Sequence, residues 1–460
     1  MASQSLVTDF TKGPIFWRLL RFSIPFMLSN ALQVLYSLVD MSIVGHYTGS
    51  EGLAAVSLSS QCFHFMTVVC VGFCTGGQVY ISQLVGSGQR ERLNRTIGTI
   101  FSTVFGIGVI VSILGMIFCH PILRVLNAPA ASYADCRSYL LVCSVGIIFT
   151  YGYNMVSAVL RGMGDSRHPF VFIVIASVMN VILDFLFVAG LGWGVFGAAL
   201  ATIISQGFSF LYAMAYLYLN RTAFGFDFKR RSYAIDPLIL KGLMKLGIPF
   251  AIRFGAINVS MLYVLAMIGS QGHTELATFG TGVKLDNTAN VICQGVMQAL
   301  AAFTGQNYGA RKFRRIRMAV YYTWAISIGF FLAYGICLWF RTEKMFGLFT
   351  TDPEVLKLSH VFVHAIIWHL PGLFLMKGTN GFMHGLGLAW LSLCFAMLDG
   401  FVIRIAFSWY LGIHQGMGFY GLTLGYSLGA YGMAIPTLIY FFFGPWEKRE
   451  LVTGAMSCQS

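Results

Sequence analysis

The sequence is poor in charged residues. Asp, Glu, Lys and Arg together make up only 10% of its 460 residues, whereas 57% of the residues are hydrophobic. Soluble domains carry about 25% charged and about 45–50% apolar residues. Folded in water, this chain would expose more apolar surface than a single core can hide. The composition therefore excludes an ordinary soluble protein and a disordered one, and we expect most of the chain to lie in a lipid bilayer.

Several motifs of catalysis and metal binding are missing. No Gly-Lys-Ser or Gly-Lys-Thr follows a glycine-rich turn, which excludes a nucleotide-binding P-loop and leaves an ion gradient as the energy source for any transport. None of the ten cysteines forms a Cys-x-x-Cys pair, and most lie inside apolar runs. This pattern favours free buried thiols over disulfides or a zinc site. We expect no catalytic residues and no cofactor.

Long apolar runs dominate what is present. A transmembrane helix needs about 20 largely apolar residues, and the sequence holds twelve such windows. They cover residues 16–45, 53–82, 97–120, 138–160, 168–190, 195–219, 243–268, 275–306, 318–340, 357–383, 388–411 and 417–443. The runs are continuous, unlike the alternating strands of a membrane barrel. The sequence therefore predicts an all-α integral membrane protein with twelve transmembrane helices.

The net charge of +13 comes from basic clusters between these windows. Clusters at Arg90–Arg95, Lys229–Arg231 and Arg311–Arg317 fall on alternate connections. This is the distribution of the positive-inside rule, whereas a nucleic-acid-binding protein gathers its charge on one folded face. We expect no nucleic-acid partner, a multi-pass protein of the cell membrane with both termini cytoplasmic, and a retained first span in place of a cleaved signal peptide.

An internal repeat organises the chain. Pro25 and Pro249 lie 224 residues apart, and Gly86 and Gly309 lie 223 apart. Other landmarks recur at this offset: Ile24-Pro25-Phe26 with Ile248-Pro249-Phe250, Gly45 with Gly269, Gln83 with Gln306, and Gly162-Met163-Gly164 with Gly385-Leu386-Gly387. Each half has an even number of spans, so the repeat is parallel, as in transporters that rock two lobes about a central seam. We predict an N-lobe (residues 1–219, helices 1–6), a basic cytoplasmic linker (220–242) and a C-lobe with a short cytoplasmic tail (243–460, helices 7–12).

Acidic residues within the spans predict an ion site. Asn180 lies one helical turn before Asp184 and shares its face, and Ala198 and Thr202 have the same spacing in the next span. Asp40, late in the first span, completes a set of oxygen ligands if the three helices converge. Such ligands suit a small cation such as Na⁺, and a sheltered carboxylate also takes up a proton readily. The residues leave H⁺ and Na⁺ open as the coupling ion.

The second half does not repeat these acids. Arg253, Lys284 and Lys377 are candidates to receive an anionic or zwitterionic group. Lys284 and Asp286, two residues apart, do not face each other on a helix. We expect the second-half acids and bases to form structural pairs between helices, Asp399 and Arg404 among them.

The order and duplication of several motifs resemble the multidrug and toxic compound extrusion (MATE) family. The resemblance covers nearly the whole chain and is carried by Leu38-Val39-Asp40 with Val44-Gly45, Leu53-Ala54-Ala55, Gln83-x-x-Gly86, Gln306-Asn307-x-Gly309-Ala310 and Arg161-Gly162-Met163-Gly164-Asp165-Ser166-Arg167. It implies two six-helix lobes and export of small amphipathic, often cationic, compounds in exchange for H⁺ or Na⁺.

The resemblance also implies a site. The residues that match the family's amino-terminal cation site are Asp40, Asn180, Asp184, Ala198 and Thr202, with Tyr139 and Asn154 nearby. Some members carry further acids in spans seven and ten, where this chain has Arg253 and Lys377. That departure argues against a second cation site in the C-lobe and against a strictly cationic substrate.

Two other functions compete with ion-coupled export by a monomer. A flippase for a lipid-linked saccharide or another amphiphile uses the same fold, and Arg253, Lys284 and Lys377 lining the seam would favour it. A membrane-embedded enzyme would need a nucleophile and a base or a metal cluster at membrane depth. His364 and His369 are the candidates for that role.

Overall fold

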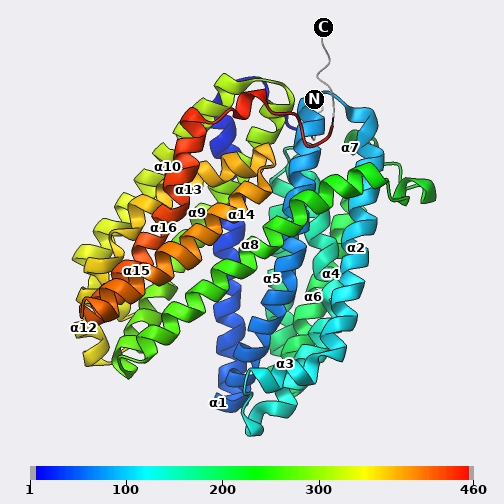
Figure 1. Ribbon diagram of the computed structural model, residues 1–460. Coiled ribbons are helices and arrows are strands. Elements are labelled where there is room, and N and C mark those ends of the chain that lie inside the picture. Colours follow the sequence, from blue (N-terminus) through cyan, green and yellow to red (C-terminus); the bar gives the residue numbers. More distant parts are fainter. Residues whose placement is uncertain (1–6, 455–460) are drawn as a thin grey trace. The chain divides into compact units, whose positions relative to one another are not determined.

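The computed structural model describes residues 7–454, and within them every regular element is a helix (Figure 1). The chain begins with α1 (Ile15–Gly86), which folds back at Gly49, where φ is 71° and ψ is −167°. Such a positive φ favours glycine. The two limbs of α1 correspond to the first two predicted spans.

The rest of the first half follows the predicted order. After η1 (Arg90–Arg92) the elements are α2 (Leu93–Ile117), α3 (Cys119–Val125), η2 (Ala130–Ser132), α4 (Tyr133–Gly162), α5 (Arg167–Asp184), the π-helix η3 (Phe185–Gly190) and α6 (Gly194–Leu219). Two short elements, α7 (Arg221–Phe224) and η4 (Arg230–Tyr233), lie in the predicted linker.

The second half repeats the arrangement with more interruptions. Its elements are α8 (Pro237–Gly269), α9 (His273–Gly309), α10 (Phe313–Phe340), α11 (Thr342–Phe346), α12 (Pro353–Ile366), α13 (His369–Leu386), α14 (Ala389–Met397), the π-helix η5 (Leu398–Ile405), α15 (Ala406–Trp409), the π-helix η6 (Tyr410–His414), α16 (Gly418–Phe443) and η7 (Trp446–Lys448). The prediction of twelve membrane helices in two lobes is confirmed. Among the described residues, nine helices are long and apolar enough to cross a membrane, and α12 with α13 forms a tenth span bent by 50°. The fold at Gly49 makes α1 count twice, and α9 is the remaining span.

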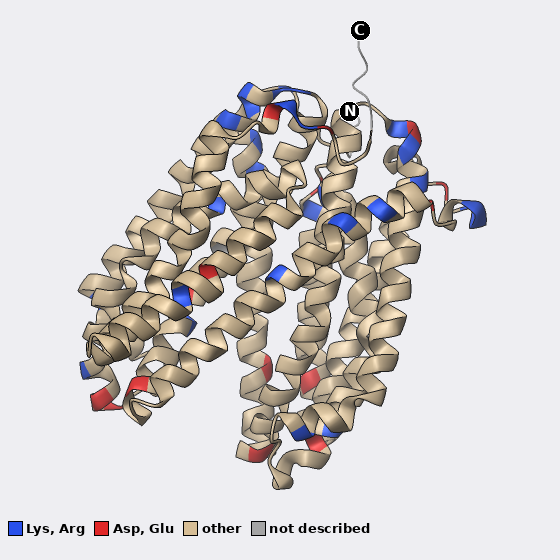
Figure 2. Ribbon diagram, viewed as in Figure 1, with Lys and Arg blue, Asp and Glu red and all other residues tan. Residues whose placement is uncertain are grey.

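The chain forms two compact units. The amino-terminal unit contains Leu28–Ala251 and the described residues before Phe10, and the carboxy-terminal unit contains Phe10–Met27 and the chain from Ile252 onward. The division therefore falls inside α1 and α8. Figure 2 shows Lys and Arg gathered at helix ends in each unit.

The same close backbone contact occurs once in each unit. A Cβ added to Gly72 would lie 2.6 Å from the backbone nitrogen of Ala251, and one added to Gly295 would lie 2.6 Å from that of Met27. Only glycine permits this approach without a shift of the backbone. The internal repeat thus extends from the sequence to the packing of the helices.

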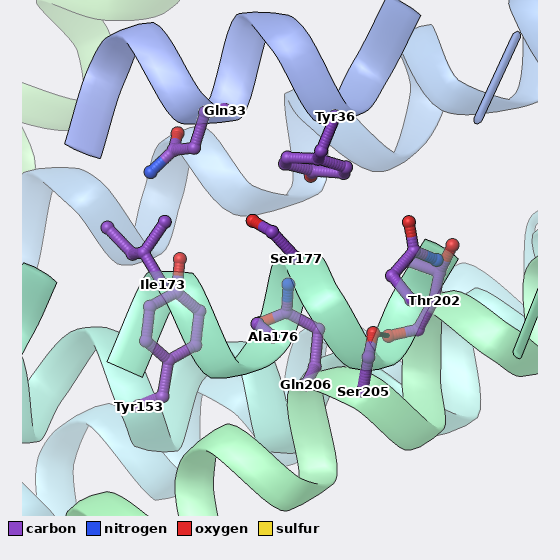
Figure 3. Close-up of a pocket in the computed structure, with 10 residues that line it drawn as sticks. Gln33, Tyr36, Tyr153, Ile173, Ala176, Ser177, Thr202, Ser205 and Gln206 are labelled. Carbon is purple, nitrogen blue, oxygen red and sulfur yellow. Dashed lines mark hydrogen bonds between the residues drawn. The ribbon is translucent and has the colours of Figure 1, made fainter. Parts of the chain in front are cut away.

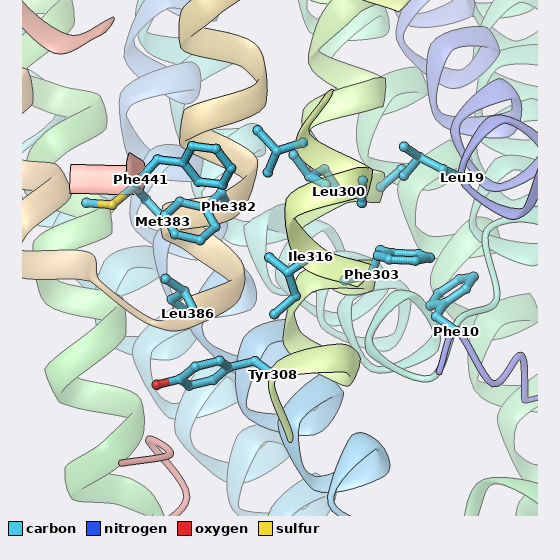
Figure 4. Close-up of a cluster of buried hydrophobic side chains, with 14 of the residues drawn as sticks. Phe10, Leu19, Leu300, Phe303, Tyr308, Ile316, Phe382, Met383, Leu386 and Phe441 are labelled. Atoms are coloured by element: carbon cyan, nitrogen blue, oxygen red, sulfur yellow. The ribbon is translucent and has the colours of Figure 1, made fainter. Parts of the chain in front are cut away.

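The Gln306-Asn307 motif holds the chain that precedes α1 within the carboxy-terminal unit. Phe10 is buried beside Phe303, with ring centroids 5.5 Å apart (Figure 4). Its amide donates a hydrogen bond to Gln306 Oε1 at 2.9 Å, and Asn307 Nδ2 donates to its carbonyl at 3.2 Å. Tyr308, the next residue, donates its hydroxyl to the Trp446 carbonyl at 3.0 Å. This motif therefore has a structural use that is independent of any ion site.

The linker packs on α2 in the amino-terminal unit. Ser102 Oγ donates to the Tyr233 carbonyl at 2.6 Å. Asp227 Oδ1 accepts hydrogen bonds from Ser232 Oγ at 2.6 Å and from the Lys229 amide at 3.0 Å. These bonds, the Ser232 one foremost, lower the pKa of the Asp227 carboxyl below its ordinary value. They are made above that pKa and weaken as the pH falls through it.

Candidate functional site

Four membrane segments of the amino-terminal unit enclose a small polar cavity of about 50 Å³. Its lining residues come from α1, α4, α5 and α6, and are Gln33, Tyr36, Tyr153, Ile173, Ala176, Ser177, Asn180, Thr202, Ser205 and Gln206. Figure 3 shows Gln33 and Tyr36 reaching from α1 toward Ser177 on α5. Six of these side chains carry an amide or a hydroxyl that can bind an ion or a polar group, besides the two tyrosines.

Asp184 and Asp40 lie next to this cavity and act on each other. Asp184 is fully buried and Asn180, one turn earlier on α5, is 2% exposed. The Asp40 carboxyl, from α1, lies close enough to that of Asp184 for direct interaction, and Tyr36 acts electrostatically on both. Convergence of α1 and α5 at this point is thus present in the structure.

The polar atoms of this group lack internal partners. Both carboxylate oxygens of Asp184, both amide atoms of Asn180 and Oδ1 of Asp40 are buried without a hydrogen-bond partner among residues 7–454. An unmet buried polar group costs about 1–3 kcal/mol, and a charged one costs more. The donor set fits a proton or a small oxygen-loving cation, because it consists of carboxylate and amide oxygens.

A change of helix type follows Asp184 directly. Asp184 is the last residue of α5, and the π-helix η3 begins at Phe185. Single π turns are common at functional sites because they alter the register of the following residues. Here the change lets the carboxyl point inward while Phe185 and Leu186 lie on the exposed side.

Ala198 and Thr202 contribute unequally. Thr202 lines the cavity, and its hydroxyl donates to the Ala198 carbonyl at 3.0 Å. The Ala198 side chain packs in a hydrophobic cluster with Val188 and Val195. Ala198 therefore takes part through its carbonyl oxygen, and Thr202 through both oxygens of its residue. The cation role of these residues stays a prediction.

Tyr139 and Asn154 lie at the edge of the group. The Tyr139 hydroxyl accepts a hydrogen bond from Ser60 Oγ at 3.2 Å and acts electrostatically on Asp40. Asn154 Nδ2 donates to the Thr150 carbonyl at 2.8 Å, while its neighbour Tyr153 lines the cavity.

The sequence analysis missed several lining residues, although a simple signal identifies them. Gln33 and Tyr36 precede Asp40 by about two turns and one turn of the same helix. Ser177 precedes Asn180 by one turn, and Ser205 and Gln206 follow Thr202 by one turn. Helical spacing from the acids alone would have placed them on the same faces.

The basic candidates of the second half are not gathered into one group. Arg253 is buried and bonds His384 through Nη1. Lys377 is buried and donates to the side-chain oxygens of Asn290 and Gln294. Lys284 lies on an exposed face of α9, in keeping with its predicted separation from Asp286.

Two buried ion pairs lie in the same unit. His369 Nδ1 on α13 is 3.4 Å from Asp286 Oδ2 on α9. Arg404 Nη2 is 2.9 Å from Asp399 Oδ1, and both residues belong to η5. The expectation that Asp399 and Arg404 pair between helices is therefore wrong, because the π-helix brings residues five apart onto one face.

The candidates for an embedded enzyme do not form a site. His369 pairs with Asp286, whereas His364 is exposed and its ring bonds the carbonyl of His360 on its own helix. Across residues 7–454 no group of three His, Cys, Asp or Glu side chains is arranged to hold a metal. The nine described cysteines are free thiols, and Cys458 lies outside the described residues.

Comparisons with known proteins match this architecture. The MatE family model matches residues 25–186 and 249–410, one copy in each half. The probable multidrug resistance protein YpnP of Bacillus subtilis (strain 168) is 26% identical over 445 residues, covering 97% of this chain and 99% of the relative. The FAD transporter of Shewanella oneidensis is 26% identical over 358 residues, covering 75% of this chain and 76% of the relative.

A solved structure supports the fold. It is described as an outward-facing conformation of a multidrug resistance MATE family transporter of the MOP superfamily, and it superposes with a TM-score of 0.91. The match covers 98% of this chain and 100% of that one, at 22% identity. Because the family model matches well over half of the sequence, the chain belongs to the MatE family, the multidrug and toxic compound extrusion transporters.

Proposed function

We propose that the protein exports small amphipathic organic compounds across the cell membrane by antiport with H⁺ or Na⁺. The observation that carries this proposal is the pair of interacting carboxyls, Asp40 and Asp184, beside a polar cavity and without internal hydrogen-bond partners for Asp184. Intramembrane acids are costly, and they are retained chiefly where they serve an ion or proton pathway.

Cation loading changes the charge of this group. With no cation bound, two carboxylates repel each other across a short distance in a medium of low dielectric constant. A proton or Na⁺ between them removes that repulsion and supplies a partner for Asn180 and Thr202. Loading drives transport only if the cation binds one of the outward-open and inward-open states more tightly than the other.

The two-lobe repeat supplies the second requirement. Parallel repeats of six helices alternate access by rocking about the axis that relates them. We propose this motion for the present chain, acting as a monomer with both termini cytoplasmic and with no nucleic-acid partner. The basic clusters at Arg90–Arg95 and Arg311–Arg317 support the orientation.

The charge of the substrate is the open part of the proposal. Arg253 and Lys377 are buried and act on each other electrostatically, which favours substrates that include an anionic or zwitterionic group. A relative named FAD transporter is compatible with such a substrate. A flippase for a lipid-linked saccharide remains the second candidate, because a pyrophosphate headgroup also needs cations. Parallel assays of dye efflux and headgroup flipping in the same proteoliposomes separate the two.

The direct test of the coupling site is Asp184→Asn. This change keeps the shape of the side chain and removes the charge that binds the cation. We expect efflux from proteoliposomes, driven by a pH gradient alone or a sodium gradient alone, to fall to the rate of protein-free vesicles. Asp135→Asn, the same change at an exposed position of α4, is the matched control and should leave efflux unchanged. Normal gradient-driven efflux by the Asp184→Asn protein would refute the assignment.

A further inference from the structure

The connection before the last span of each unit has the same backbone. Gly192 and Gly194 have φ values of 66° and 54°, and Gly416 and Gly418 have φ values of 67° and 55°. Each glycine pair follows a π-helix, η3 in one unit and η6 in the other. The two connections are therefore equivalent at a spacing of 224 residues.

Backbone hydrogen bonds agree with this register. Trp193 N donates to the Phe187 carbonyl at 2.9 Å, and Met417 N donates to the Leu411 carbonyl at 3.2 Å. Donors and acceptors are again 224 residues apart. Because both sides of the connection keep this spacing, residues one to three turns away on the flanking helices can be matched between the units.

At this spacing Arg404 corresponds to Asn180, and Tyr426 corresponds to Thr202. Asn180 and Thr202 line one cavity. The guanidinium carbon of Arg404 lies 5.1 Å from the centre of the Tyr426 ring. The matched residues are thus neighbours in both units, which supports the correspondence independently of the count.

The guanidinium fills the place that the cavity has in the amino-terminal unit. A Cβ added to Gly429 would lie 2.9 Å from Arg404 Nε, and Gly429 corresponds to the cavity residue Ser205. The Arg404 and Asp399 side chains are 8% and 3% exposed and are joined by a 2.9 Å contact. An organic cation of the protein itself therefore stands where the other unit presents its ion-binding oxygens.

We infer that Arg404 is a tethered cation, occupying in the carboxy-terminal unit the position equivalent to the exchangeable-cation site, so that this unit stays permanently loaded while the amino-terminal unit alone exchanges its ion. The inference rests on the proposed function of the Asp40 and Asp184 group. It assigns Arg404 a positioning role and gives the two units unequal parts in the cycle.

The acids of the amino-terminal site have no counterparts here. Asp184 corresponds to Ser408, whose hydroxyl donates to the Leu422 carbonyl at 3.0 Å. Asp40 corresponds to the buried Val264. The counter-charge of Arg404 is instead Asp399, on the same π-helix. Arg404 cannot dissociate, so its neutralisation of Asp399 does not depend on pH or on sodium.

Other ionisable groups face this pair and belong to its electrostatic setting. They are Arg253 on α8, Asp286 on α9, His369 on α13 and Tyr426 on α16. These groups remain unchanged in the variants below. A response that appears only when Arg404 is altered therefore belongs to the Asp399 carboxylate.

The test compares thermal unfolding of the purified full-length protein in the Asp184→Asn background, which removes the proposed exchangeable site. Addition of Arg404→Gln leaves the Asp399 carboxylate without its cation. We expect this variant to gain stability as the pH falls from about 8 to 6, or as Na⁺ is added at pH 8, because protonation or sodium then replaces the guanidinium. A midpoint rise of roughly 2–4 °C beyond that of the Asp184→Asn parent is expected.

Two control variants isolate the tethered charge. Arg404→Lys keeps a cation, and Asp399→Asn with Arg404→Gln removes both charges, so both should respond to pH and sodium like the parent. The inference is overturned if Arg404→Gln also responds like the parent, or if Arg404→Lys acquires the new response. If Arg404→Gln does not fold, the doubly neutral variant should still fold, and its failure would equally overturn the inference.

The proposed function fails by a different result. If the wild-type response to pH and sodium persists unchanged in Asp184→Asn, the amino-terminal site is not the coupling site. The comparison of Arg404 variants with their parent does not depend on that outcome.

Discussion

Buried charge is treated differently by individual residues of the two units. Lys377 has two side-chain oxygens as partners, and Arg404 has Asp399. Asp184, although equally buried, has no hydrogen-bond partner within residues 7–454. A satisfied charge can be purely structural, whereas an unsatisfied one is stabilised by something that arrives from outside. This contrast identifies the amino-terminal group as the exchangeable one.

The interaction of Asp40 with Asp184 predicts non-additive substitutions. If the two carboxyls hold one cation jointly, removal of either charge destroys the site, and removal of the second has little further effect. We expect Asp40→Asn, Asp184→Asn and the double variant to show similarly low efflux. In the same double-mutant cycle, thermal stability should reveal a coupling energy of about 0.5–3 kcal/mol, as for residues in contact. Additive losses would indicate two independent carboxylates.

Glycines set how closely the elements approach each other. A Cβ on Gly146 of α4 would lie 2.0 Å from Ile203 of α6, and one on Gly152 would lie 2.4 Å from Phe210. These two contacts hold α4 against α6, the helix that carries Ala198 and Thr202. The separation of the helices around the cavity therefore depends on the absence of side chains at positions outside it.

The approach of the linker to α2 gives an element-scale prediction. A Cβ on Gly98 would lie 1.7 Å from the carbonyl oxygen of Ser232, whereas one on Gly106, on the same helix, would meet nothing within 4 Å. Gly98→Ala must therefore displace the linker and should destabilise the protein by about 1–3 kcal/mol. Gly106→Ala should be neutral or slightly stabilising, because alanine is the better helix former. Equal midpoints for both variants in thermal unfolding would show that the linker yields freely.

Duplication shapes the whole molecule, with a shared backbone and divergent chemistry. The contact of Gly72 with Ala251 and that of Gly295 with Met27 are alike, and so are the connections at Gly194 and Gly418. Helix count, order and crossing contacts thus follow the repeat. The polar groups do not, because side chains at matched positions are free to differ once the backbone is packed.

A parallel repeat requires equivalent connections to lie on the same side of the membrane. Single substitutions Arg90→Cys and Arg314→Cys place thiols in the predicted cytoplasmic connections, and Arg124→Cys and Lys344→Cys place them opposite; all four positions are exposed. In intact cells, a membrane-impermeant maleimide should label Arg124→Cys and Lys344→Cys above the wild-type background and spare the other two. Permeabilised cells should show labelling of all four. Labelling of one member from each half of a matched pair would contradict the parallel topology.

The sequence by itself determined the membrane spans, the repeat and the likeness of faces on single helices. These are local properties: a run of apolar residues is read along the chain, and Asn180 and Asp184 share a face because of helical periodicity. Only the tertiary structure decided that Gln33, Tyr36 and Tyr153 meet Asn180 and Thr202 around one cavity, and that Arg404 lies against Tyr426. The rotation of each helix depends on contacts with partners far away in the chain. The π-helices add a further non-local effect, because they change the register within a span, as at Asp399 and Arg404.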